Sequence, residues 1–420
     1  MCIEPLSSAM ETIINNQILN YLMENGLIPE QQYGFVPGKD AGTIACLKDA
    51  VGKWILNAEK GKYTVITSFD LTAAFPTLST EIVMNKMKLL GIKQNTIDWF
   101  KDYLDYRILS TKVGDEISDK IKTHNQISEG SPISSTLFLI QVCDINEHLE
   151  YSTSNQFADD EVQSYSHKSL ETALKHAELD ANTTVQYFKN NKFSIQPSKT
   201  ALLIIRPKRK YKNTSKCEII VDGKKIKEKN NFKMLGMQID QRLNFEDHCS
   251  KVISKSRRIL AAIKRLSPYI SVESATKILK SCLIGKVMYG GIFYLSKTKL
   301  RRQIEIIVMK AVRIITQTKL KDRIRNDNLR DSLKVTSIER LYKRQILHEM
   351  VKWEKKRDLF FQSVSSKTRG STYNQLRPIG TKLNTKNSFL SNMQLLWNEY
   401  NHLINQKLNK KFKFQIRYII

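Results

Sequence analysis

The 420-residue sequence contains few cysteines and no long apolar run. Its six cysteines include no pair at the spacing of a metal-binding finger; they stand at positions 2, 46, 143, 217, 249 and 282. No segment resembles a signal peptide, and no uninterrupted apolar stretch has the length of a membrane span. Internal repeats are absent as well. The sequence therefore predicts an intracellular protein of the nucleus or cytoplasm, in a reducing setting and with no membrane partner.

Positive charge is the most one-sided property of the composition. The net charge is +27, but residues 1–200 carry 18 Lys and Arg against 25 Asp and Glu, whereas residues 201–420 carry 50 against 16. Basic residues concentrated in one half of a chain displace counterions from phosphates and give affinity for a polyanion. Solvated helix faces would explain scattered lysines, but an excess this large favours a nucleic acid partner. With 41% apolar residues, the chain also has enough hydrophobic material for two or three packed domains.

Two adjacent carboxylates, Asp159 and Asp160, lie between a short polar strand and a β-prone one. Adjacent residues of a strand point to opposite faces, so both side chains reach one place only at the tip of a hairpin. Their mutual repulsion must then be offset, and a divalent cation such as Mg²⁺ offsets it well. Taken alone the pair is a weak signal, because two acids in sequence are common in solvated turns.

A third carboxylate strengthens this interpretation. Residues 63–70 read as a buried strand that ends at Asp70, and a helix with Ser79 or Thr80 as its N-cap follows. An acid at the end of a strand together with an acidic hairpin is the arrangement that two-metal phosphoryl transfer requires. The sequence therefore predicts that Asp70 and Asp159 lie close enough to share cations.

Six short motifs follow one another along the first part of the chain. They are Tyr33-Gly34-Phe35; Phe69-Asp70 with Ala74-Phe75; Ser128-Glu129-Gly130-Ser131-Pro132 with Leu137-Phe138; Phe157-Ala158-Asp159-Asp160; Pro197-Ser198-Lys199-Thr200; and Leu235-Gly236. In their order and approximate spacing the chain resembles a reverse transcriptase of the Jockey-like retrotransposons that lack long terminal repeats. Each motif is weak alone, but six in sequence are specific. The resemblance continues through Leu243-Asn244-Phe245, His248 and the basic helical tract from Lys251 to about Asp358.

The resemblance implies an α+β fold. A polymerase palm, made of an antiparallel sheet with helices and partial fingers, is followed by a helical thumb and a basic helical C-terminal region. Residues 1–60 correspond to fingers and palm helices, 61–240 to the palm with the catalytic motifs and primer grip, 241–330 to the thumb, and 331–420 to the C-terminal extension.

The resemblance also implies a catalytic role for the acids. Asp70 and Asp159 hold two Mg²⁺ ions, for which Mn²⁺ can substitute, the Leu71 carbonyl acts as a backbone ligand, and Asp160 assists at the tip. Lys199 lies near the triphosphate, where it stabilises charge or donates a proton to pyrophosphate.

Further positions are implied to bind nucleotide and primer. Phe75 lies under the sugar, where its ring excludes a 2′-hydroxyl. Glu129 and Gly130 belong to a loop whose backbone approaches the nucleotide. Leu235 and Gly236 form the primer grip. The implied partners are an RNA template, a DNA primer and deoxynucleoside triphosphates.

Three departures from the family pattern bear on activity. The group usually carries Gln at the position of Glu129, and extra negative charge beside a triphosphate is unfavourable unless a Lys or Arg side chain is close. It usually carries Asp at the position of Pro76, and proline restricts the preceding residue. The first residues, Cys2 to Ser8, resemble sequence that directly follows the basic fingers motif. We therefore expect a fragment without the N-terminal fingers, whose polymerisation is impaired by the truncation.

Two other functions stay open from the sequence. One is a catalytically inactive remnant that acts only as a basic nucleic-acid-binding module, which Glu129 and the missing fingers favour. The other is a palm-type polymerase that copies DNA, which the motif order disfavours. Intact Asp70, Asp159 and Asp160 oppose the inactive remnant, because a site free to drift would readily lose a repelling acid pair. The motif order together with Phe75 then favours an RNA-directed DNA polymerase.

Periodicity and turn signals predict the remaining elements. Helices are expected at residues 11–24, 42–57, 95–106, 132–150, 170–190, 248–266, 271–289, 298–318 and 336–357. Hairpin turns are expected at Gly114-Asp115 and Asp222-Gly223. A strand pair containing Lys199 is expected within residues 192–205, and a single strand from Phe232 to Ile239.

Overall fold

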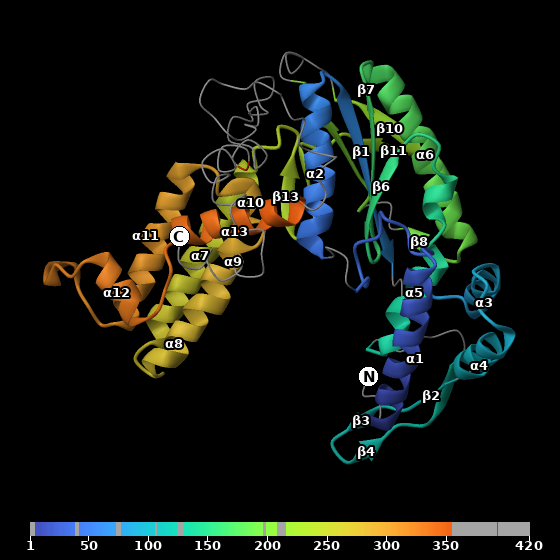
Figure 1. Cartoon of the computed structure of the whole chain (residues 1–420), viewed down its shortest axis with the longest axis horizontal. Coiled ribbons are helices and arrows are strands. Elements are labelled where there is room, and N and C mark those ends of the chain that lie inside the picture. Colours follow the sequence, from blue (N-terminus) through green and yellow to red (C-terminus); the bar gives the residue numbers. More distant parts are fainter. Residues whose placement is uncertain are drawn as a thin grey trace. The chain divides into compact units, whose positions relative to one another are not determined.

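The computed structural model describes the greater part of the chain. The described residues are 5–37, 42–72, 77–105, 107–123, 130–195, 199–207, 216–354 and 393. The chain divides into two compact units, Met1–Gly236 and Met237–Ile420. The first unit combines helices with antiparallel strands, whereas the described part of the second is almost entirely helical (Figure 1). No helix in these ranges is both long and apolar enough to cross a membrane.

A five-stranded antiparallel sheet forms the centre of the first unit. β1 (Tyr63–Thr72) pairs with β7 (Asp160–His167), and β7 pairs in turn with β6 (Thr153–Phe157). On its other edge β1 pairs with β9 (Ala201–Ile205) and, nearer its end, with β8 (Ser194–Ile195). β1 therefore lies in the middle of the sheet, which agrees with the burial of most of its side chains.

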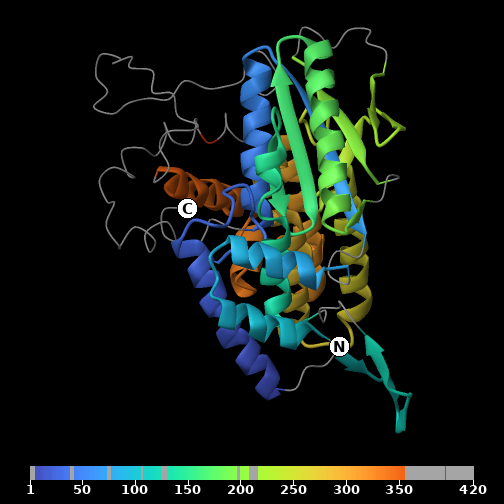
Figure 2. The same cartoon turned by 90° about the vertical axis from the view of Figure 1, so that its right-hand side faces the viewer.

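Two helices cover the sheet on opposite faces. α2 (Thr43–Glu59) lies along one face and α6 (Leu170–Asn190) along the other (Figures 1 and 2). The buried alanines of α6 at positions 173, 177 and 181 repeat every four residues and share one stripe of the helix. They belong to one core cluster with Val65 and Phe69 of β1, and their small size lets the helix approach the strand that ends at Asp70.

A second core of the first unit is helical. It is built by α1 (Pro5–Glu24), α3 (Thr80–Leu89), α4 (Gln94–Asp105) and α5 (Pro132–Val142). The buried side chains at its centre include Leu22, Leu78, Met87, Phe100, Leu137 and Phe138. Proline suits the first turn of α5, because the amide hydrogen that it lacks would have no partner within the helix.

Short hairpins complete the first unit. Between α4 and α5, β2 (Arg107–Leu109) pairs with β5 (Ile121–Thr123), and β3 (Lys112–Val113) pairs with β4 (Glu116–Ile117). After β9, β10 (Glu218–Val221) pairs with β11 (Lys224–Lys227), and β12 (Asn231–Met234) follows. The turn at Asp222-Gly223 has φ angles of 51° and 71°, so the hairpin predicted there is confirmed.

The second unit begins with β13 (Met237–Asp240), after which helices follow. α7 (Glu246–Leu266) packs against α11 (Thr298–Ile315). The other helical segments are α8 (Val272–Ile278), a π-helical segment (Leu279–Ile284), α9 (Gly285–Met288), α10 (Gly291–Tyr294), α12 (Asn326–Ser332) and α13 (Ile338–Glu354). Asp240 accepts hydrogen bonds from the backbone of Arg242, Asn244 and Phe245, which fixes the turn that leads into α7.

Three expectations about these elements are wrong. α5 ends at Val142 rather than at Glu150, and a 3₁₀ turn follows at Ile145–His148. The strands of residues 192–205 do not pair with each other, because β1 is long enough to pair with β8 and β9 at separate positions. The stretch from Phe232 to Ile239 is not one strand, because Leu235 and Gly236 have φ angles of 44° and 82° and separate β12 from β13.

Candidate active site

The adjacent acids Asp159 and Asp160 stand at the tip of a hairpin, as predicted. β6 and β7 pair up to Phe157 and Asp160, which leaves Ala158 and Asp159 as a two-residue turn. Ala158 has a φ of 55°, in the left-handed region that costs a residue with a Cβ atom about 1–2 kcal/mol. Strain of this kind persists only where the surroundings hold the backbone in place.

Asp70 of β1 lies directly opposite Asp160 of β7 in the register of the sheet. Residues opposed in this way have Cβ atoms roughly 4.5–5.5 Å apart, and like charges at such positions are destabilising. The pKa of Asp160 is raised to about 6, first by partial desolvation of its carboxyl group and then by the charges of Asp159 and Asp70. The structure thus brings Asp70 to the same end of the sheet as the adjacent acids Asp159 and Asp160, which are distant from it in the sequence.

Lys199 brings a positive charge to the same place. Its Nζ lies 2.8 Å from Oδ2 of Asp70, and both side chains are partly exposed. Lys199 precedes β9, so the pairing of β8 and β9 with β1 places it beside the end of that strand. A second lysine, Lys233, lowers the pKa of Asp160, but its effect is smaller than the raising effects of desolvation and of the two neighbouring acids. The ammonium of Lys199 therefore neutralises one of the acids.

The other predicted positions are distributed as follows. Leu71 continues β1 beyond Asp70 and is buried opposite Ile195. Gly130 has a φ of 96° and stands two residues before the first residue of α5. Leu235 and Gly236 form the turn after β12. Phe75, Pro76 and Glu129 lie outside the described residues.

The sequence alone did not single out the polar residues beneath the acidic turn. Glu161, next to Asp160, is buried, accepts hydrogen bonds from Ser154 and Gln163, and has a pKa raised to about 7 by burial. Gln32 is also buried, and its side-chain oxygen, Oε1, accepts a hydrogen bond from the backbone N–H of Ala158 at 3.1 Å. The period-two pattern could have placed Glu161 on the opposite face from Asp160, but no signal in the sequence indicates that Gln32 reaches this turn.

The donor set of this site suits a hard divalent cation. Carboxylate oxygens are the ligands that Mg²⁺ prefers, and it fills its remaining positions with water and phosphate. In the part of the chain that the structure describes, no three Asp, Glu, His or Cys side chains form a ready-made metal cage. The acids instead meet at the end of the sheet, where the charges of Asp159 and Asp70 add to desolvation in raising the pKa of Asp160, and a bound cation would offset their repulsion.

The residues of this site all lie within the segment 2–239, which matches the family model described as reverse transcriptase (RNA-dependent DNA polymerase). The chain belongs to this family. Its α+β fold, with helices around an antiparallel sheet, is the polymerase palm fold that the sequence predicted. Reverse transcriptases as a family use divalent metal ions and bind RNA templates.

Curated relatives narrow the kind of reverse transcriptase. The chain is 25% identical over 188 residues to the retrovirus-related Pol polyprotein from type-1 retrotransposable element R2 of Popillia japonica, covering 42% of this chain and 31% of that protein. It is 23% identical over 301 residues to the RNA-directed DNA polymerase from mobile element jockey of Drosophila melanogaster, covering 68% and 32%. To the probable RNA-directed DNA polymerase from transposon X-element of the same fly it is 22% identical over 345 residues, covering 79% and 37%.

These relatives confirm the predicted resemblance to a Jockey-like reverse transcriptase. The chain spans about a third of the length of the curated relatives that it matches, between 31% and 37%. Among solved structures, apo telomerase from Candida tropicalis is similar with a TM-score of 0.43 and 11% identity, covering 82% of this chain and 54% of that one.

Proposed function

We propose that this chain is an RNA-directed DNA polymerase of a retrotransposon without long terminal repeats. It extends the 3′-hydroxyl of a primer along an RNA template and consumes deoxynucleoside triphosphates. The observation that carries the proposal is the opposition of Asp70 and Asp160 across β1 and β7, with Asp159 in the adjoining turn. In a member of the reverse transcriptase family, acids grouped in this way suit two-metal phosphoryl transfer.

The acids take distinct parts in the proposal. Asp70, Asp159 and the carbonyl of Leu71 would hold two Mg²⁺ ions, and Asp160 would assist from the end of β7. The chemistry that such a pair would supply is activation of the attacking hydroxyl and stabilisation of the leaving oxygens of an in-line displacement. The chain's own contribution is to keep the carboxylates together at one end of a buried sheet despite their repulsion.

Lys199 serves the triphosphate in the proposal. Its ammonium already lies at the site, 2.8 Å from Asp70. An exposed ion pair of this kind contributes little stability, so the ammonium can turn to a phosphate at small cost. There it would offset charge or give a proton to the departing pyrophosphate.

The remaining residues would position the substrates. Phe75 would lie under the sugar and exclude ribonucleotides, Glu129 and Gly130 would border the nucleotide, and Leu235 with Gly236 would grip the primer. The positive φ angles of Gly130, Leu235 and Gly236 make tight backbone turns, which let a backbone approach a ligand closely.

The basic half of the chain would hold the duplex. α7 carries six basic side chains on its unburied positions, Lys251, Lys255, Arg257, Arg258, Lys264 and Arg265, while Val252, Ser256 and Ile263 are buried. A helix with one packed face and one basic face can follow a phosphate backbone without reading sequence. This fits the charge asymmetry of the chain.

The test is primer extension with Mg²⁺ on RNA and DNA templates of the same sequence. We expect extension on RNA, and a loss of roughly a hundredfold to a thousandfold in Asp159→Asn. Asp115→Asn is the matched control, because Asp115 occupies the two-residue turn between β3 and β4, outside the sheet that carries the acids. Equal extension on DNA would favour a DNA-copying palm polymerase, and binding without extension would favour the inactive remnant.

A further inference from the structure

The acidic turn is held from outside its own hairpin, by the segment Gln31–Gly34. The backbone N–H of Tyr33 donates to the carbonyl of Gln156 at 2.8 Å, and the N–H of Gln156 donates to the carbonyl of Gln31 at 2.9 Å. Gln32 and Gln156 thereby form a parallel bridge at the free edge of β6. This segment lies beside the strand that leads into the turn.

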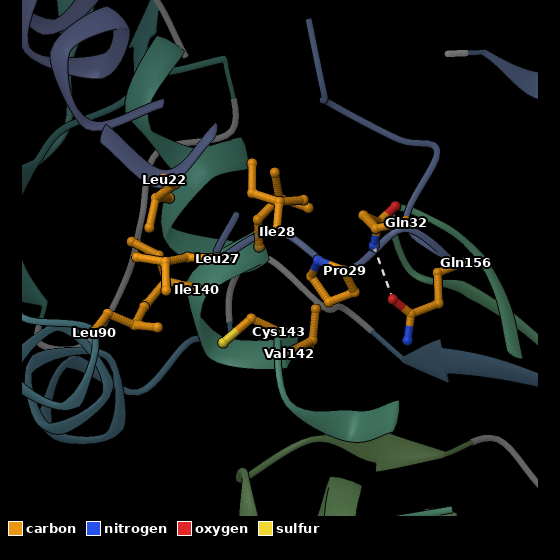
Figure 3. A pocket seen from close by; sticks show the side chains of 11 residues that line it. Leu22, Leu27, Ile28, Pro29, Gln32, Leu90, Ile140, Val142, Cys143 and Gln156 are labelled. Carbon is orange, nitrogen blue, oxygen red and sulfur yellow. Dashed lines mark hydrogen bonds between the residues drawn. The ribbon is translucent and has the colours of Figure 1, made fainter. Parts of the chain in front are cut away.

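Gln32 reaches from this segment into the turn itself. Its side chain is 1% exposed, so its amide has to find partners within the protein. Its Oε1 accepts the N–H of Gly34 at 2.8 Å and the N–H of Ala158 at 3.1 Å, while its Nε2 donates to Oε1 of Gln156 at 3.4 Å. Figure 3 shows this last contact beside a cavity that is otherwise lined mainly by apolar side chains.

Gly34 makes the approach close enough for these bonds. A Cβ atom at this position would stand 2.3 Å from the backbone nitrogen of Ala158 and 3.1 Å from the carbonyl carbon of Phe157. Both atoms belong to the backbone and cannot turn aside as a side chain would. Only glycine therefore lets the segment lie directly against the turn.

The turn needs this support, because Ala158 holds a left-handed conformation with a φ of 55°. The residue that follows is Asp159, and the one after it is Asp160, whose carboxylate is repelled by two others. A buried acceptor at Ala158 N–H fixes the turn just before these acids. We infer that Gln32 is a positioning residue for the metal-binding acids, and that Gly34 is the position that gives it access to their turn.

This inference rests on the proposed function only in treating Asp159 and Asp160 as metal ligands. Removing the residues that orient metal ligands typically costs about 10–100-fold in metal affinity. A buried glutamine with a merely structural role would lower stability without changing metal affinity. The two roles therefore differ in a measurable way.

The experiment compares Gln32→Met, which keeps length and volume but loses the acceptor, with Gln163→Met. Gln163 is 1% exposed and bonds to the side chains of Thr184 and Glu161, so its replacement is a matched loss of a buried amide in the same sheet. Mn²⁺ affinity of the full chain is measured by electron paramagnetic resonance, and hydrogen exchange is followed by mass spectrometry on the peptide around Ala158.

We expect Gln32→Met to weaken Mn²⁺ binding by about tenfold or more and to speed exchange at Ala158, with neither effect in Gln163→Met. Gln32→Glu keeps an acceptor oxygen and should restore the protection of Ala158. If Gln32→Met fails to fold, Gly34→Ala is measured in its place and should likewise show weaker Mn²⁺ binding and faster exchange at Ala158. Wild-type Mn²⁺ affinity in a folded Gln32→Met, or equal losses in Gln163→Met, would overturn the inference.

The proposed function and this inference can fail separately. If the wild-type chain binds no Mn²⁺, the metal-dependent function is contradicted, yet exchange at Ala158 still decides whether Gln32 holds the turn. If the wild-type chain binds Mn²⁺ and polymerises while Gln32→Met does both equally well, only the positioning role is wrong.

Discussion

The ammonium of Lys199 lies 2.8 Å from the carboxylate of Asp70, at the end of the central strand of the sheet. The pair places a positive charge next to a proposed metal ligand. If Asp70 binds metal as proposed, a divalent cation and the ammonium would compete for one oxygen, Oδ2 of Asp70. Since both side chains are partly exposed, the ion pair contributes little free energy. A rising metal concentration should therefore displace the ammonium from Asp70.

Lys199→Met is expected to have opposite effects on metal binding and on catalysis. Removing the competing positive charge should tighten Mn²⁺ binding several-fold in the absence of nucleotide. The rate of nucleotide addition should fall, because the triphosphate loses the ammonium that offsets its charge. Isothermal titration and single-turnover extension measure the two effects. The control is Lys189→Met, which breaks a similar exposed pair, Lys189 with Asp222 at 2.6 Å. Weaker Mn²⁺ binding by Lys199→Met would show that the lysine supports the metal site instead of competing for it.

Neutralising the basic face of α7 should weaken binding to an RNA–DNA hybrid and make it less dependent on salt. In Lys255→Gln/Arg258→Gln/Arg265→Gln, the slope of log affinity against log salt should flatten by up to about 0.9 for each phosphate that the helix no longer neutralises. Fluorescence anisotropy at several salt concentrations gives this slope. As a control, Lys88, Lys93 and Lys101, which are exposed in the first unit, are replaced by Gln together. An equal loss in the control would mean that affinity follows net charge and that α7 has no special part.

His248 should make the second unit less stable in mild acid. Its ring is buried, its Nδ1 accepts the N–H of Gln238 at 3.2 Å, and its pKa is lowered to about 4 by burial and then by Lys286, Lys251 and Lys255. A lowered pKa means that the folded state favours the neutral ring. The contribution is therefore fully present above pH 6.5, the ordinary value for histidine, and is lost as the pH falls toward 4.

This prediction is checked by urea unfolding followed by circular dichroism at pH 7 and pH 5. The wild-type chain should lose roughly 1–2 kcal/mol more than His248→Gln over this interval. His348→Gln replaces an exposed histidine of α13 and should behave like the wild type. If His248→Gln loses as much stability as the wild type, the buried ring is not the acid-sensitive group.

The sequence predicts best where local signals agree with packing. α6 spans the predicted residues 170–190, because Ser169 caps the helix by accepting the N–H of Thr172 and one stripe of small apolar residues faces the sheet. The meeting of Asp70 with the acidic hairpin was also predictable. The prediction rests on chemistry, because two-metal phosphoryl transfer needs an acid at the end of a strand to lie beside an acidic hairpin.

Contacts that depend on tertiary structure were not predictable. Nothing in two consecutive glutamines before Tyr33 indicates that the second is buried under a turn more than a hundred residues away, since glutamine is usually exposed. β8 and β9 were expected to pair with each other, because a strand's hydrophobic pattern does not say which neighbour it will take. The contact of Lys199 with Asp70 likewise arises from that pairing.

Single-turnover addition of one deoxynucleotide to a primer on an RNA template tests the proposed polymerase site most directly. It compares the wild-type chain with Asp70→Asn, which keeps the shape of the side chain but lowers its charge, and primer–template affinity is measured in parallel. We predict that wild-type protein adds the nucleotide with Mg²⁺, and that Asp70→Asn is slower by roughly a hundredfold or more with unchanged primer–template affinity. Addition by Asp70→Asn at the wild-type rate, or no addition by the wild type despite tight binding, would contradict the assignment of this site to polymerisation.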